Sequence, residues 1–295
     1  MRTKTITLSL GLAALTLASC DAKDPVYKTD HPDHGRLTLT ADFSQRGAGI
    51  DVPASYIVTI GDFSDRLYGE TNEIEHLFTP GKYTAYVYNT PTDIHMDGTT
   101  ASVSTVPAPA DTDAEGAFVE ASPEWLFTCS QDTVLYPDTD YRLRALMEQQ
   151  VRQLTLIIEP TGGTTDRVER IEGYLSGVAG SFDIANGMHS TPSNVALTFT
   201  RIHEGADAGK WAATVRLLGT TDTPQKLTAT LVFSDGGPAP VRLESDLSTG
   251  LAAFNADKPT PLTLGGRVVE THTPAGFTAT ITEWNPVQGG GVTAN

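Results

Sequence analysis

The sequence predicts an all-β protein built from two tandem β-sandwich domains. The first supporting observation is strict alternation in residues 36–43, which places Leu37, Leu39, Ala41 and Phe43 on one face of a strand. The second is that strand-like segments recur about every 8 to 12 residues, the spacing typical of sandwiches. The third is the near absence of segments with helical periodicity.

In the first half of the chain, strands are expected at 36–43, 56–60, 82–88 and 101–106, and Pro80-Gly81 supplies a turn before the third of these. Residues 107–116, PAPADTDAEG, have the composition of an exposed loop. Residues 142–150 could form a helix on composition. The alternation of Tyr141, Leu143, Ala145 and Met147 favours a strand instead.

The second half begins at Val151 with an alternating segment that sets Leu154, Leu156 and Ile158 on one face. In both 36–39 and 152–156 an Arg is followed closely by Leu-Thr-Leu, which places a domain boundary near residue 150. The predicted domains are therefore 36–150 and 151–295. Further strands are expected at 194–200, 210–218, 226–233, 240–244, 261–269 and 276–284, with a hairpin turn at 234–237.

The N-terminus has the pattern of a lipoprotein signal peptide. Arg2 and Lys4 precede an apolar segment, 6–17, that is too short to span a membrane as a helix. Leu17-Ala18-Ser19-Cys20 then resembles a bacterial lipobox, so we expect residues 1–19 to be removed and the Cys20 thiol to carry lipid. Ordinary secretion without lipid is the alternative. Residues 20–35 are predicted to be a tether.

Composition excludes some functions and limits the covalent options. Removal of residues 1–19 takes the formal net charge from −16 to −18, and such an acidic chain repels nucleic acid. With Cys20 acylated, Cys129 has no disulfide partner. Because Cys129 follows Trp125-Leu126-Phe127-Thr128, we expect it to be a buried apolar residue and not a reactive thiol.

Three segments resemble the fimbrillin (FimA-like) superfamily of Bacteroidales: VRQLTL at 151–156, IEGYLSGVAG at 171–180 and ITEWNPVQGG at 281–290. The resemblance implies a lipidated outer-membrane protein with two transthyretin-like domains, which serves in a surface fimbria. It also implies other fimbrial subunits as partners, and no cofactor. Acidic residues directly after Cys20 resemble a surface-export signal of this bacterial group, although Asp21 resembles an inner-membrane retention signal of other bacteria.

Assembly in that superfamily proceeds by strand donation, in which a subunit gives up its first strand and accepts a strand from its neighbour. The resemblance maps the displaced strand to Leu37, Leu39, Ala41 and Phe43. Arg46 is a candidate proteolytic site directly after it, Arg36 is a competitor, and no cleavage is a third possibility. Gly289-Gly290-Gly291 is a poor donor strand, which favours an anchor, tip or accessory subunit over a stalk subunit.

Catalytic and metal-binding motifs are nearly absent from the sequence, so we expect no enzyme activity. Asp111, Asp113 and Glu115 alternate as in the first half of a calcium loop, but Ser122 stands where the bidentate acid is required. A solvated acidic loop is the favoured interpretation. His31 and His34 could share a metal, but both fall in the predicted tether.

The alternative function is a surface lipoprotein that does not polymerise and binds a glycan or host protein through loops such as 107–116. Trp125 is the tryptophan to follow for such binding, since it lies in an irregular segment. Trp211 opens an alternating strand and is expected in the core, while Tyr83 and Tyr136 fit packing roles equally well.

Overall fold

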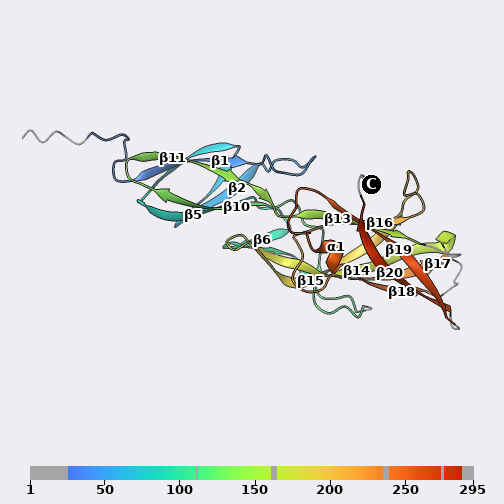
Figure 1. Ribbon diagram of the computed structural model, residues 1–295. Coiled ribbons are helices and arrows are strands. Elements are labelled where there is room, and N and C mark those ends of the chain that lie inside the picture. The colour runs from blue at the N-terminus through green and yellow to red at the C-terminus, as the bar shows by residue number, and fades with distance from the viewer. Residues whose placement is uncertain (1–25, 111, 161–164, 235–238, 274–275, 288–295) are drawn as a thin grey trace, which may run out of the picture.

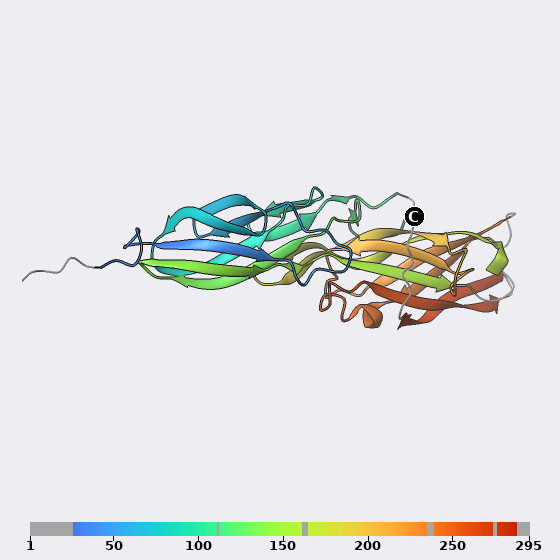
Figure 2. The same cartoon turned by 90° about the horizontal axis from the view of Figure 1, so that it is seen from above.

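The computed structural model describes residues 26–110, 112–160, 165–234, 239–273 and 276–287. The predicted all-β class is confirmed. In the described part of the chain, the helical elements are a 3-10 turn, η1 (Thr165–Arg167), and the four-residue α1 (Ser248–Leu251). None of the described helices has the length and apolarity needed to cross a membrane. The two domains lie end to end in an elongated molecule (Figures 1 and 2).

The N-terminal domain consists of a three-stranded and a five-stranded sheet that pack face to face. The smaller sheet has the order β11-β1-β4, and the larger has the order β12-β10-β5-β2-β3. The strands are β1 (Gly35–Asp42), β2 (Ser55–Ile60), β3 (Phe63–Tyr68), β4 (Thr71–Phe78), β5 (Gly81–Tyr88), β10 (Phe127–Leu135), β11 (Thr139–Leu146) and β12 (Glu148–Gln149).

Alternation along these strands produces the core between the two sheets, because every second side chain faces the opposite layer. Phe78, Phe127 and Tyr56 are its largest fully buried members. The core comprises Leu37, Leu39, Ala41, Phe43, Tyr56, Val58, Ile60, Leu67, Ile74, Phe78, Ala85, Val87, Phe127, Cys129, Leu135, Leu143, Ala145 and Met147.

The C-terminal domain is built on eight strands whose pairings form a closed circuit: β14-β17-β18-β20-β19-β13-β16-β15 and back to β14. Two of the links are short, since β15 pairs with β16, and β18 with β20, through two residue pairs each. The strands are β13 (Arg152–Glu159), β14 (Val168–Asp183), β15 (Met188–Arg201), β16 (Trp211–Leu217), β17 (Lys226–Phe233), β18 (Val241–Asp246), β19 (Leu262–Thr273) and β20 (Gly276–Pro286).

One segment from the first half of the chain adds four strands to the sheet of the C-terminal domain. Its strands are β6 (Ile94–Asp97), β7 (Thr100–Val103), β8 (Thr105–Val106) and β9 (Phe118–Val119). β7 pairs with β14 at 181–183, and β9 pairs with β15 at 194–195. Strands β6 to β9 therefore lie with the C-terminal core, although the sequence boundary near residue 150 assigns them to the N-terminal domain.

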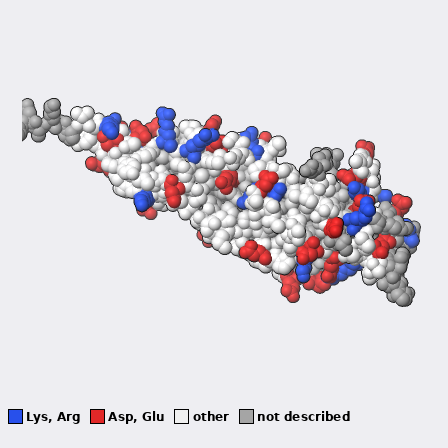
Figure 3. Space-filling model, viewed as in Figure 1, with Lys and Arg blue, Asp and Glu red and all other residues white. Residues whose placement is uncertain are grey.

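Leu154, Leu156 and Ile158 are buried as expected, and so is Trp211. Thr155 and Ile157, which alternate with them, are buried too, so β13 is covered on both faces and not on one. Residues 139–149 form strands β11 and β12, so the strand interpretation of 142–150 is also confirmed. Turn residues 235–237 lie outside the described residues. Figure 3 shows acidic and basic side chains interspersed, without a broad basic surface on the face that it draws.

Candidate functional site

The predicted displaced strand, β1, lies in the middle of its sheet. It runs parallel to β11 over eight consecutive residue pairs, from Gly35 opposite Thr139 to Asp42 opposite Leu146, and antiparallel to β4 on its other side. Removal of β1 would therefore leave a gap bounded by two strand edges. The four inward side chains, Leu37, Leu39, Ala41 and Phe43, are all buried in the N-terminal core.

The outward face of β1 is tied to its neighbours by polar contacts. The Asp42 carboxylate lies 2.6 Å from the Arg144 guanidinium on β11, and the Thr40 and Thr71 hydroxyls are 3.0 Å apart across the pair with β4. At the start of the strand, Arg36 contacts the carboxylate of Asp30 at 2.9 Å and that of Glu73 at 3.5 Å. β1 is thus held from both faces.

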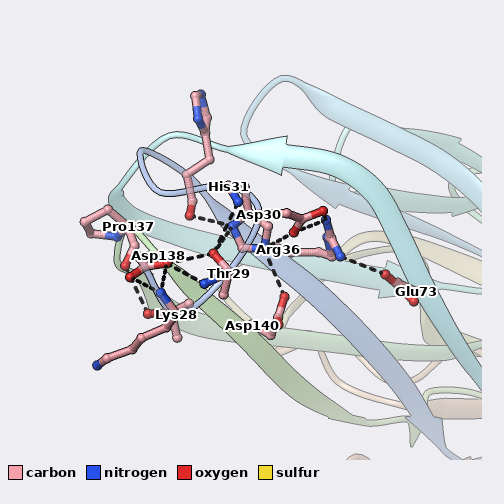
Figure 4. A network of polar contacts seen from close by, with 11 residues as sticks. Lys28, Thr29, Asp30, His31, Arg36, Glu73, Pro137, Asp138 and Asp140 are labelled. Carbon is pink, nitrogen blue, oxygen red and sulfur yellow. Dashed lines mark hydrogen bonds and ion pairs between the residues drawn. The ribbon is translucent and has the colours of Figure 1, made fainter. Parts of the chain in front are cut away.

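The segment before β1 is fixed to the turn between β10 and β11, as Figure 4 shows. The Asp138 carboxylate accepts hydrogen bonds from the backbone N–H groups of Lys28 and Thr29 and from the Thr29 hydroxyl, at 2.7 to 2.9 Å. These bonds hold the pKa of Asp138 below its usual range, the Lys28 N–H having the largest effect. The second half of the predicted tether, 20–35, is docked on the N-terminal domain. We call residues 28–34 together with Asp138 and Asp140 the N-terminal latch.

His31 is the buried centre of this latch, with 3% of its surface exposed. Its Nδ1 lies 2.9 Å from the His34 carbonyl oxygen, and its Nε2 lies 3.0 Å from the Asp140 carboxylate. Since both ring nitrogens face acceptors, the protonated imidazolium satisfies both contacts. The His34 carbonyl and then Asp140 raise the pKa of His31. Both ring nitrogens of His31 are therefore engaged within the latch, one of them by the backbone and not the side chain of His34.

The two candidate proteolytic sites differ in accessibility. Arg36 lies inside β1, and 27% of its side chain is exposed. Arg46 lies in an exposed turn after β1, where its guanidinium donates to the carbonyl oxygens of Ile50 and Phe43. Gly47, the residue that a cut after Arg46 would make N-terminal, donates its N–H to the Gln149 side chain at 2.9 Å. A protease would reach the turn at Arg46 more readily than the hydrogen-bonded strand at Arg36.

Trp125 packs against the cores of both domains, which makes it a residue of the domain junction. The Arg216 guanidinium lies over its ring, 5.4 Å from the centroid, and donates to the Pro123 carbonyl oxygen at 2.7 Å. The same indole lines a groove of about 470 Å³ together with Asp51, Glu124 and other residues. One face of Trp125 is thereby covered by Arg216.

The acidic loop 107–116 contacts the C-terminal domain by an ion pair. Asp113 lies 2.6 Å from the Arg242 guanidinium and accepts a 3.3 Å hydrogen bond from the Tyr174 hydroxyl, and Arg242 lowers the pKa of Asp113. Glu115 contributes its carbonyl oxygen to Asn194. Asp111 lies outside the described residues. Within the described part of the chain, no three His, Cys, Asp or Glu side chains are arranged to hold a metal ion.

The two cysteines have separate places. Cys20 lies outside the described residues. Cys129 is a free, buried thiol in the N-terminal core, as predicted, and burial raises its pKa to about 11, so it is not a thiolate at neutral pH.

Sequence reasoning did not find Asp138, Asp140 or Gln149, which hold the residues on either side of β1. The available signal for Asp138 is Pro137-Asp138-Thr139, a typical turn sequence, and its φ of +55° is one that Asp tolerates better than most residues. A turn signal, however, does not reveal which distant segment the carboxylate binds.

Comparisons with known proteins show the family to which the chain belongs. Residues 51–288 match the family of fimbrillin-A associated anchor proteins Mfa1 and Mfa2. The chain belongs to this family. The predicted fimbrillin-type identity is therefore confirmed, and its fimbrial and adhesion character follows from the family.

Solved structures show the same fold at low sequence identity. The fimbrial anchor protein Mfa2 from Porphyromonas gingivalis superposes with a TM-score of 0.53 and 12% identity, over 83% of this chain and 95% of that chain. A candidate adhesin from Bacteroides ovatus gives a TM-score of 0.56 and 14% identity, over 85% and 93% of the two chains. A candidate polysaccharide-binding protein from Bacteroides thetaiotaomicron gives 0.54 and 10%, over 86% and 98%. The search of curated protein sequences found no match to this chain.

Proposed function

We propose that this chain is the lipid-anchored base of a surface fimbria, and that it remains uncut with β1 in place. Lipid on Cys20 holds the chain in the outer membrane, and residues 21–27 lead from the lipid to the N-terminal latch. The observation that supports this function best is the fixation of β1, which the latch holds at its start and which pairs with both β11 and β4 along its length.

The latch suits an anchor for a mechanical reason. A pull on the fimbria is resisted at the lipid, so the path of force runs through residues 21–36 into β1. Asp138 and Asp140 connect this path to β11, and the eight-pair ladder spreads the load along the strand. A cut after Arg36 or Arg46 would separate the lipid from the rest of the chain and remove that function.

Other fimbrial subunits are the proposed partners, joined to this chain by strand donation. As the sequence resemblance implies, we propose that both domains are transthyretin-like sandwiches of the kind that exchanges strands. A tip or accessory subunit is the competing position within the fimbria, and it needs cleavage after Arg46 so that the β1 gap can accept a strand.

Mass analysis of the mature protein from its own cells tests the proposal. We expect the N-terminus to be an acylated Cys20, and a Cys20→Ser variant to lose lipid and to leave the membrane fraction. The matched control is Cys129→Ser, which removes a buried thiol that the proposal does not use and should stay membrane-bound. A mature chain that starts at Gly47 would contradict the anchor assignment and support the strand-accepting position.

A binding function at Trp125 is the second candidate, and its groove at the domain junction is the observation that favours it. Titration of the chain with oligosaccharides, followed by indole fluorescence, tests it. Quenching that is lost in Trp125→Ala and kept in Trp284→Phe would support glycan binding, and no quenching would contradict it.

A further inference from the structure

The first strands of the two domains have the same neighbours. β1 runs parallel to β11 and antiparallel to β4, and β13 runs parallel to β19 and antiparallel to β16. In this correspondence β11 is the counterpart of β19. The two sheets can therefore be compared strand by strand around these positions.

In the C-terminal domain, the outer edge of β19 is covered by β20. The two strands are antiparallel and share nine residue pairs, and β20 also runs parallel to β18 in the opposite layer at Leu243 and Glu244. Ala279 and Ile281 of β20 are buried in the core. Gly266 of β19 permits this close approach, because a Cβ there would lie 2.6 Å from the Ile281 side chain.

In the N-terminal domain, the counterpart edge is open. β11 is the end strand of its sheet, and among the described residues β1 is its only ladder partner. In the opposite layer, β10 pairs with β12 only at Phe127 and Thr128, so its stretch 129–135 has β5 on one side and no ladder on the other within the described chain. A cavity of about 260 Å³, lined by Cys129, Leu146 and others, lies at the junction end of this seam.

The backbone groups of β11 show which residues face the open side. Directly after β11, the N–H of Met147 donates to the Asp42 carbonyl oxygen, toward β1. Since the N–H and C=O groups of successive strand residues point in opposite directions, those of residues 140, 142, 144 and 146 point away from β1. The N–H of Leu146 accordingly contacts the Cys129 thiol on β10.

β11 also lacks two of the common protections of a sheet edge. It carries no proline, and its register with β1 runs without a bulge. It does carry the charged residues Asp140, Arg142 and Arg144. Two of these are engaged within the domain, Asp140 with His31 and Arg144 with Asp42. The outer edge of β11 is long and regular, and two of its three charged side chains are paired within the domain. It therefore resembles the covered edge of β19 more than an edge that is protected against pairing with another strand.

We propose that the outer edge of β11 is a docking site for an extended strand of another fimbrial subunit. The strand runs antiparallel to β11 and parallel to β10, as β20 does between β19 and β18. Its alternate residues are small or branched and apolar, like Ala279 and Ile281, because they face the seam beside Leu143, Ala145 and Cys129. This site is separate from exchange of β1, since β1 must stay in place to hold β11.

A fluorescent peptide with the sequence of β20, residues 276–286, tests the site by polarisation against the purified mature chain. Arg142→Pro removes an outward-pointing N–H and adds a ring on the open edge, while it leaves the ladder with β1 intact. Arg142→Ala is the matched control, because it removes the same charge and keeps the N–H. We expect saturable binding to the wild type and to Arg142→Ala, and at least about tenfold weaker binding to Arg142→Pro.

Absence of saturable binding to the wild type would overturn the proposal. Equal binding by the two Arg142 variants would also overturn it, since the peptide would then be replacing β20 in the C-terminal domain. Circular dichroism and thermal unfolding check that Arg142→Pro is folded. If Arg142→Pro is not folded, the same comparison is made with Arg144→Pro and its control Arg144→Ala, two residues further along β11. The mass of the mature chain from cells, which tests the anchor function, is independent of both outcomes.

Discussion

In each domain the first strand has one parallel and one antiparallel neighbour, but the two layers of each domain are joined differently. In the C-terminal domain β20 bridges the layers on one side, and the two-residue pairing of β15 with β16 links them on the other. In the N-terminal domain β3 and β4 are joined by a turn without a ladder, and β10 and β11 likewise. The chain itself thus shows how such an edge is covered, which makes the uncovered edge of β11 informative.

The domains also differ in how the start of the first strand is secured. Arg36, before Leu37 of β1, binds the exposed carboxylates of Asp30 and Glu73. Arg152, at the start of β13, is 5% exposed and donates to the carbonyl oxygens of Thr260, Ala253 and Phe254. One domain therefore uses a surface ion-pair network where the other uses a buried cation held by backbone oxygens.

The largest effect is expected from removal of the strand that closes the C-terminal domain. A chain that ends at residue 275 loses the buried side chains of Ala279 and Ile281 and the ladder to β19, which together stabilise the domain by on the order of 5 kcal/mol. We expect hydrogen exchange to show the C-terminal domain unfolded and the N-terminal domain protected. A chain that ends at residue 287 is the control. Full protection of β13 and β19 in the shorter chain would show that β20 is dispensable.

The next effect compares equivalent core positions in the two first strands. Leu39 and Leu156 are both fully buried and both follow Leu-Thr, so Leu39→Ala and Leu156→Ala should each cost about 2 to 5 kcal/mol. We expect Leu39→Ala to destabilise only the N-terminal domain and Leu156→Ala only the C-terminal one. Domain-resolved hydrogen exchange in denaturant measures this. Equal loss of protection in both domains from either variant would mean that the two cores unfold as one unit.

Most strands could be predicted from the sequence because alternation is a local signal. β1, β2, β5, β13, β16 and β17 lie where alternation places them. β14 is the clearest omission. Its 16 residues include a run from Val178 to Phe182 that is buried on both faces, so the period of two disappears. The bulge between Leu175 and Val178, at Gly177 with φ of +72°, interrupts the pattern further.

The candidate site could be predicted only in part. The inward face of β1 follows from Leu37 and Leu39, since burial and period fix it. The latch could not be predicted, because Lys28 and Asp138 are 110 residues apart and their contact depends on the β10–β11 turn. The pairings of β7 with β14 and of β9 with β15 are likewise long-range, and the sequences of these short strands do not specify their partners.

The third prediction separates the two arginines. Arg152→Ala leaves three backbone carbonyl oxygens without their donor in a buried place, and we expect a loss of about 2 to 4 kcal/mol in the C-terminal domain. Arg36→Ala removes only screened surface ion pairs, so its unfolding midpoint should hardly change. Urea unfolding measures both. A larger loss for Arg36→Ala would mean that the ion pairs of Arg36 with Asp30 and Glu73 stabilise the N-terminal domain more than surface pairs usually do.

The smallest effect is expected from the pH dependence of the latch. At the equivalent place in the C-terminal domain, the start of β13 is held by Arg152 instead. The raised pKa of His31 means that its contribution is complete below its ordinary value of 6.5 and is lost as pH rises through the folded pKa. The lowered pKa of Asp138 has the opposite sense, so its contribution is present above 3.8 and is lost as pH falls through the folded value. The latch should therefore be tightest between these two limits.

Hydrogen exchange of residues 28–34, normalised to the intrinsic rate at each pH, measures this window. In the wild type we expect protection to fall on the alkaline side as His31 loses its proton and can donate to only one of its two acceptors, the His34 carbonyl or Asp140. His31→Gln should be less protected and should lose the alkaline step, while Asp138→Asn should lose the acid step and keep the alkaline one. An alkaline step that persists in His31→Gln would contradict its assignment to His31. Asp30 also approaches the His31 ring, at 3.8 Å, but its hydrogen bond with Arg36 lowers its pKa, so Asp30→Asn checks the acid step and should leave the alkaline one unchanged.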